Sequence, residues 1–153
     1  MRKNNLSFLL LAGILFCFAI EAKAQDDDFP DMSYLRTDVR SSSVVARVII
    51  RSYEEVDRIG DKSFYALYRI EGEVQEVFKG KAKKGQLLEF YYAVENGYSR
   101  SIVGDDCIVF LQNNYNEKTK KKNLSEIENS RLPTNESRLK KLRRIKAERT
   151  KKH

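Results

Sequence analysis

The sequence predicts an all-β protein with a C-terminal helix, arranged as a five-stranded Greek-key barrel of the oligonucleotide/oligosaccharide-binding (OB) type. Apolar residues between 43 and 113 alternate with polar ones, which is the period of a β-strand. Gly72 interrupts the longest of these runs, as expected where a strand coils into a barrel. An immunoglobulin-like sandwich is the alternative, but it needs about seven strands, and five runs can be found.

The chain has 153 residues, and residues 1–24 have the three-part layout of a secretory signal peptide. Arg2 and Lys3 give the charged start, and an apolar run follows from 6 to 20. This run is shorter than the ~20 residues that a membrane-spanning helix requires. We therefore predict cleavage after Ala24, a secreted or periplasmic location, and no transmembrane span in the cleaved protein.

An acidic leader, expected to be flexible, occupies residues 25–42. The barrel is predicted for residues 43–133. A register break between Val74 and Val77 indicates an irregularity within its second strand. The predicted strands, the last of them weak, lie at 44–53, 64–78, 87–94, 107–112 and 122–128.

Residues 134–153 predict a basic C-terminal helix and tail. Leu139, Leu142 and Ile145 recur at steps of three, and a polar residue is available before them to cap the helix. Because this apolar stripe is narrow, we expect the helix to dock by one edge and to leave its Lys and Arg side chains in water.

Charge is segregated along the chain. Residues 25–117 contain 12 basic and 17 acidic residues, whereas residues 118–153 contain 14 basic and 4 acidic ones. The net charge of +7 is therefore a property of the tail, which suits either a polyanion-binding segment or a helix kept soluble by its charge. The candidate polyanion-binding residues are Lys140, Lys141, Arg143, Arg144, Lys146 and Arg149.

A second candidate binding surface combines aromatic and basic residues. Tyr65 and Arg69 on the second predicted strand, with Tyr91 on the third, would share one face of the barrel, and Tyr98 and Arg100 follow in the next loop. Each tyrosine also fits an ordinary outward-facing strand residue.

The residues argue against an enzyme. The one histidine is His153, and with two cysteines no array of zinc ligands at the usual spacing can be written. After cleavage the one remaining cysteine is Cys107, which lies in an apolar run and beside two aspartates that would raise its pKa. We predict no catalytic residue, no metal and no cofactor.

Several runs of the sequence resemble the netrin-like module. This family includes the inhibitory domain of the tissue inhibitors of metalloproteinases and small exported bacterial proteins of similar plan. The likeness extends over roughly residues 41–142 and implies a barrel closed by a C-terminal helix. The runs that carry it are Ser43-Val44-Val45-Ala46-Arg47-Val48, Tyr68-x-Ile70, Val74-x-x-Val77-Phe78-Lys79-Gly80, Gly85-x-Leu87-x-Glu89-Phe90 and Cys107-Ile108-Val109-Phe110-Leu111.

One part of the family's pattern is absent from this sequence. In the animal inhibitors a cysteine at the mature amino terminus binds the protease's catalytic zinc. The predicted first residue here is Gln25, and an acidic leader that must be ordered on binding follows it. No inhibitory residue can therefore be carried over.

The function predicted from sequence is an exported, non-catalytic binding module of netrin-like type that lacks the inhibitory N-terminal cysteine. Attachment to a polyanion or to the cell-envelope surface through the basic tail is the alternative. The expected partner is a protein or a polyanionic envelope component, and the export signal argues against nucleic acid.

Overall fold

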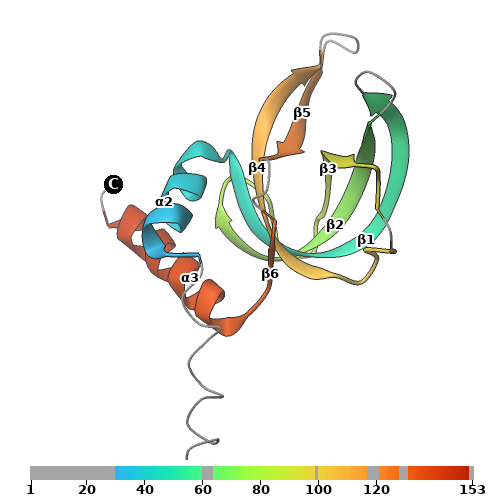
Figure 1. Ribbon diagram of the computed structural model, residues 1–153. Coiled ribbons are helices and arrows are strands. Elements are labelled where there is room, and N and C mark those ends of the chain that lie inside the picture. Colours follow the sequence, from blue (N-terminus) through green and yellow to red (C-terminus); the bar gives the residue numbers. More distant parts are fainter. Residues whose placement is uncertain (1–29, 60–63, 99, 117–120, 128–130, 152–153) are drawn as a thin grey trace, which may run out of the picture. The chain divides into compact units, whose positions relative to one another are not determined.

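The structure, a computed structural model, is shown in Figure 1. The predicted signal peptide, 1–24, and the start of the predicted leader lie outside the described residues. Residues Met32–His153 form a compact unit of their own. The structure describes residues 30–59, 64–98, 100–116, 121–127 and 131–151.

The described residues of this unit form two helices and six strands. In chain order they are α2 (Met32–Ser41), β1 (Val44–Ile59), β2 (Tyr65–Lys79), β3 (Leu87–Glu95), β4 (Asp106–Asn116), β5 (Lys121–Glu126), β6 (Leu132–Pro133) and α3 (Glu136–Thr150).

The first five strands close into a barrel. β1 pairs with β2 and β4, β2 pairs with β3, and β4 pairs with β5, all antiparallel. A parallel contact between Tyr91 of β3 and Ser125 of β5 completes the ring. The strand order and the C-terminal helix confirm the predicted OB-like Greek-key barrel. β6, which the sequence did not predict, adds a short pairing to β4.

Two of the four pairing shifts between β1 and β2 lie where the sequence predicted irregularities. Pairing shifts opposite Gly72, so that Arg51 forms a bulge in β1. A Cβ atom added to Gly72 would lie 2.9 Å from the Cβ of Val48, a distance that real structures do not tolerate. A second shift leaves Gln75 of β2 without a partner on β1, between Val74 and Val77. These bulges let the long β1–β2 hairpin coil around the barrel.

Apolar side chains form two cores because β1 and β4 bury residues on both of their faces. One core fills the barrel and includes Val48, Ile70 and Phe90. The other lies between the barrel and the two helices, which pack side by side against the barrel (Figure 1). This outer core consists of Leu35, Val39, Val45, Phe78, Ile108, Phe110, Leu139, Leu142 and Ile145.

The structure corrects the prediction of a flexible leader for residues 32–41. They form α2, in which the side chains of Leu35 and Val39 are 0% and 3% exposed. Residues four apart lie on one face of a helix, so both point into the outer core. A helix of 10 residues is marginal in isolation, and packing against the barrel supplies its stability.

The C-terminal helix docks by the edge that the sequence predicted. The side chain of Asn135 caps its start by accepting a hydrogen bond from the N–H of Arg138 at 2.8 Å. Leu139, Leu142 and Ile145 are buried in the outer core. Neither α2 nor α3, the helices found in the described part of the chain, has the length and apolar character needed to span a membrane.

Candidate functional site

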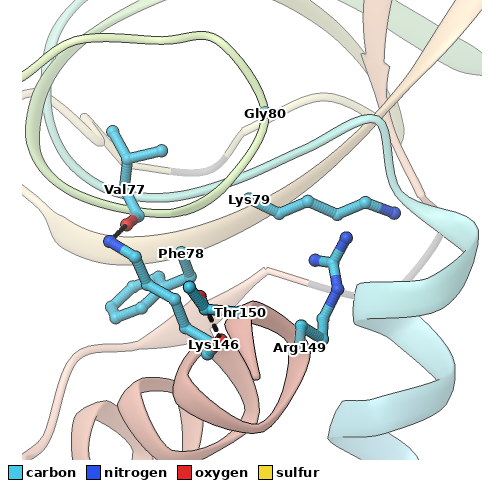
Figure 2. Close-up of a pocket in the computed structure, with 7 residues that line it drawn as sticks. All are labelled: Val77, Phe78, Lys79, Gly80, Lys146, Arg149 and Thr150. Carbon is cyan, nitrogen blue, oxygen red and sulfur yellow. Dashed lines mark hydrogen bonds between the residues drawn. The ribbon is translucent and has the colours of Figure 1, made fainter. Parts of the chain in front are cut away.

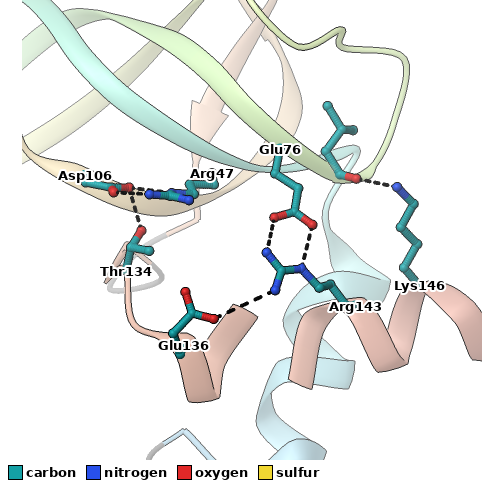
Figure 3. Close-up of polar contacts among 8 residues, drawn as sticks. Arg47, Glu76, Asp106, Thr134, Glu136, Arg143 and Lys146 are labelled. Atoms are coloured by element: carbon teal, nitrogen blue, oxygen red, sulfur yellow. Dashed lines mark hydrogen bonds and ion pairs between the residues drawn. The ribbon is translucent and has the colours of Figure 1, made fainter. Parts of the chain in front are cut away.

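Polar contacts hold α3 against β2 (Figure 3). The Arg143 guanidinium makes two hydrogen bonds to the carboxylate of Glu76, at 2.9 and 2.8 Å, and holds the pKa of that carboxylate below its usual value. Lys146 Nζ donates to the carbonyl of Val77 at 2.8 Å. Arg144 bonds to Glu148, one turn further along α3. These predicted tail residues therefore already have protein partners.

The other predicted tail residues differ in their surroundings. Lys141 also has an interaction partner within the protein. Lys140 is exposed. Arg149 lies in the last turn of α3, where it lines a pocket of about 370 Å³ between that turn and the end of β2 (Figure 2). Val77, Phe78, Lys79, Gly80, Lys146, Arg149 and Thr150 line this pocket, and none of them is acidic.

A second pocket, of about 260 Å³, adjoins the first, because Lys79 and Arg149 line both. We call the two pockets together the basic cleft. Among the described residues that line the cleft, Glu148 is the one carboxylate, and it pairs with Arg36 at 2.9 Å. The residues found in the second pocket alone are Arg36, Val39, Arg40, Ile145 and Glu148.

Lys79 is fixed at the centre of the basic cleft. Its ammonium group donates to the carbonyls of Val39 and Arg40, at 2.8 and 3.1 Å, at the C-terminal end of α2, where the helix dipole favours a cation. Burial, and then the positive charge of Arg149, lower the pKa of Lys79. The sharp turn after β2 brings it there: Gly80 has a φ of +95°, a conformation that favours glycine.

The guanidinium of Arg149 lies beside the ammonium group of Lys79 in Figure 2. Within the part of the chain that the structure describes, no hydrogen bond or ion pair engages this guanidinium. Lys79 and Arg149 thus line both pockets, and the carboxylate beside them, Glu148, is paired with Arg36. Such an arrangement attracts an anion, whose charge relieves the repulsion.

The predicted aromatic and basic surface is only partly assembled. Arg69 and Tyr91 lie directly opposite each other on β2 and β3. Tyr65 is four residues from Arg69 along β2, which corresponds to about 13 Å at ~3.3 Å per residue. The Arg69 guanidinium pairs with Glu54, and the hydroxyl of Tyr91 donates to Glu89 at 3.1 Å.

Tyr98 and Arg100 do not join that surface. The ring of Tyr98 packs against the rings of Tyr53 and Tyr68, with centroids 5.6 and 4.7 Å away, at the edge of the barrel core. Arg100 pairs with Asp105 at 2.9 Å. The structure therefore does not gather the five predicted residues into one binding face.

A buried ion pair that the sequence analysis missed lies near Tyr98. Arg131 makes two hydrogen bonds to Glu126, at 2.6 and 2.7 Å, and their side chains are 17% and 0% exposed. The guanidinium also stacks over the rings of Tyr92 and Tyr98, at 5.0 and 5.8 Å from their centroids. Burial raises the pKa of Glu126, and Arg131 offsets part of that effect. Arg131 thus engages both oxygens of the Glu126 carboxylate.

Cys107 is buried in the barrel core. Burial raises the pKa of its thiol to about 12, so the nucleophilic thiolate is scarce at neutral pH. Within the residues that the structure describes, no three His, Cys, Asp or Glu side chains are grouped so that they could hold a metal ion.

Comparison with known proteins returned no match, either to a protein-family model or to a curated protein. The resemblance to the netrin-like module stays a prediction. The basic cleft is therefore the site on which a functional proposal can be based.

Proposed function

We propose that the protein is a non-catalytic binding module that recognises an anionic ligand through the basic cleft. The observation that carries this proposal is the convergence of Lys79 and Arg149 on both pockets, in which the one carboxylate among the described lining residues, Glu148, is paired with Arg36. Export from the cytoplasm and membership of the netrin-like family remain predictions from the sequence, and the proposal depends on neither.

The cleft is preorganised for such a ligand. Three elements supply its cations, and the outer core fixes these elements to one another. A bound anion would not have to order a loop or a tail, so the main conformational entropy cost is that of ordering the exposed Arg149 side chain.

This proposal differs from attachment through the whole basic tail. Arg143, Arg144 and Lys146 are hydrogen-bonded to the protein, whereas the cleft combines Arg149 of the tail with Lys79 of the barrel. Diffuse attraction by a charged helix would depend on net charge alone. Recognition by the cleft depends on which cation is removed.

Heparin, a soluble polyanion, provides a test by calorimetric titration of the purified chain at several salt concentrations. The variants are Arg149→Gln and, as a matched control, Lys140→Gln, which removes the same charge from an exposed position of α3 that lines neither pocket. We expect Arg149→Gln to weaken binding about tenfold, as the loss of a charge-assisted hydrogen bond does, and Lys140→Gln to weaken it less than twofold. Equal losses would support the diffuse tail instead, and a parent chain that does not bind would refute both readings.

A further inference from the structure

We infer that the basic cleft selects a phosphate monoester attached to an apolar body, such as the headgroup of phosphatidic acid. This inference rests on the proposed function and names the ligand class of the same site. It follows from the hydrogen-bond donors that Lys79 and Arg149 still have available, and from the half-buried Val77 that lines the first pocket with them.

The donors match three acceptor oxygens. An ammonium group has three N–H donors, and Lys79 uses two of them on the carbonyls of α2, so one remains. The Arg149 guanidinium offers a planar fork of two parallel N–H groups. Together they supply three donors from two cations. A phosphate monoester presents three terminal oxygens and a charge of about −1.5 to −2, whereas a carboxylate presents two oxygens and a single charge.

The walls of the cleft suit the carbon part of such a ligand. Val77, which is half-buried, lines the first pocket, and the two cations lie where the two pockets meet. Phe78, Val39 and Ile145 also line the pockets, but each is at most 4% exposed. The first pocket, at about 370 Å³, falls within the ~300–1,000 Å³ range of small-molecule sites. A phosphate held by Lys79 and Arg149 would therefore have Val77 and the aliphatic stems of the lining Lys and Arg side chains beside it.

A neutral polysaccharide fits this lining less well. Sugars are commonly held by exposed aromatic rings and by many neutral hydrogen-bond partners. Among the described residues that line the two pockets, Phe78 is the one aromatic residue, and it is 3% exposed. The polar groups of the lining are mainly cationic, which favours a compact anion over a string of hydroxyl groups.

Titration with short-chain phosphatidic acid (dihexanoyl), kept below its micelle concentration, tests the inference. The comparison ligands are inorganic phosphate, which lacks the apolar body, and hexanoate, which has a carboxylate in place of the phosphate. We expect phosphatidic acid to bind at least tenfold more tightly than either. Phosphatidylcholine vesicles with and without long-chain phosphatidic acid form a second arm: binding there as well places the ligand in a membrane, and binding of the short-chain form alone identifies a free amphiphile.

Two substitutions separate the inference from the proposed function. Arg149→Lys keeps the charge and removes the fork, so it should reduce the preference for phosphatidic acid over hexanoate at least threefold. Lys140→Gln should leave both the preference for phosphatidic acid over hexanoate and heparin binding unchanged. Equal affinity for phosphatidic acid, inorganic phosphate and hexanoate, with heparin binding still dependent on Arg149, would overturn the inference and leave the proposed function standing. A chain in which Arg149→Gln affects none of these ligands would overturn both.

Discussion

Helix α2 should be an integral part of the folded domain, and truncating Leu35 tests this. The side chain is 0% exposed in the outer core, and Leu35→Ala removes the equivalent of about three methylene groups, worth ~0.8 kcal/mol each, plus a cavity term. We expect the free energy of unfolding to fall by about 3 kcal/mol. Urea denaturation followed by circular dichroism measures it.

Tyr34→Ala is the matched control on the same helix. Its side chain is larger than that of leucine but 63% exposed, so the expected change is within about 0.5 kcal/mol. If the two variants had the same stability, α2 would not be packed as the structure shows. Because α2 supplies the carbonyls that hold Lys79, its undocking in Leu35→Ala should also weaken heparin binding.

Three further predictions concern the barrel. Arg131→Met should lower the free energy of unfolding by about 3–5 kcal/mol, because it leaves the Glu126 carboxylate buried without its partner. Adding Glu126→Leu should recover most of that loss in urea denaturation. A double variant no more stable than the single one would contradict this prediction. Burial raises the pKa of the Cys107 thiol to about 12, so iodoacetamide at pH 8 should modify the native chain at least ~100-fold more slowly than the urea-unfolded chain. Mass spectrometry of the Cys107 peptide follows this reaction. Similar rates would refute the buried position of the thiol. Hydrogen bonds from Arg47 hold the pKa of Asp106 below its usual value, so the stabilising contribution of the Asp106 carboxylate is complete above the unfolded pKa of ~3.9 and is lost as pH falls through the lower folded pKa. Asp106→Asn should therefore lose less stability than the parent chain on acidification below pH ~4. Equal losses would argue against the Arg47–Asp106 pair.

The barrel was predictable because its signals are local. Alternating apolar residues define the strands, and Gly72 marks the point where β1 and β2 approach too closely for a side chain. The apolar spacing of Leu139, Leu142 and Ile145 was equally direct for α3.

Helix α2 was missed because its signal is weak in isolation. Its buried side chains, Leu35 and Val39, stand among polar residues that follow an acidic run. Their spacing of four residues indicates a buried helix face only when an apolar surface is available for the helix to pack on. That surface is built from β1, β2, β4 and α3, which lie later in the chain.

The candidate site depended on contacts between distant parts of the chain. Lys79 and Arg149 are 70 positions apart, and the docking of α3 next to the end of β2 brings them together. The tail residues could be identified as a group, but their local surroundings could not. The position of Tyr98 also depended on such contacts, because the chain after β3 turns its ring toward the barrel core, against Tyr68.

The central claim is that an anion binds between Lys79 and Arg149, and the protonation of Lys79 reports on it most directly. NMR of lysine side-chain signals, assigned with a Lys79→Arg variant, measures this pKa with and without short-chain phosphatidic acid. We predict a pKa below the ordinary lysine value in the free protein and a clear rise when the ligand is added, because the phosphate offsets both the burial and the charge of Arg149. A Lys79 pKa that stays the same at saturating ligand would contradict the claim.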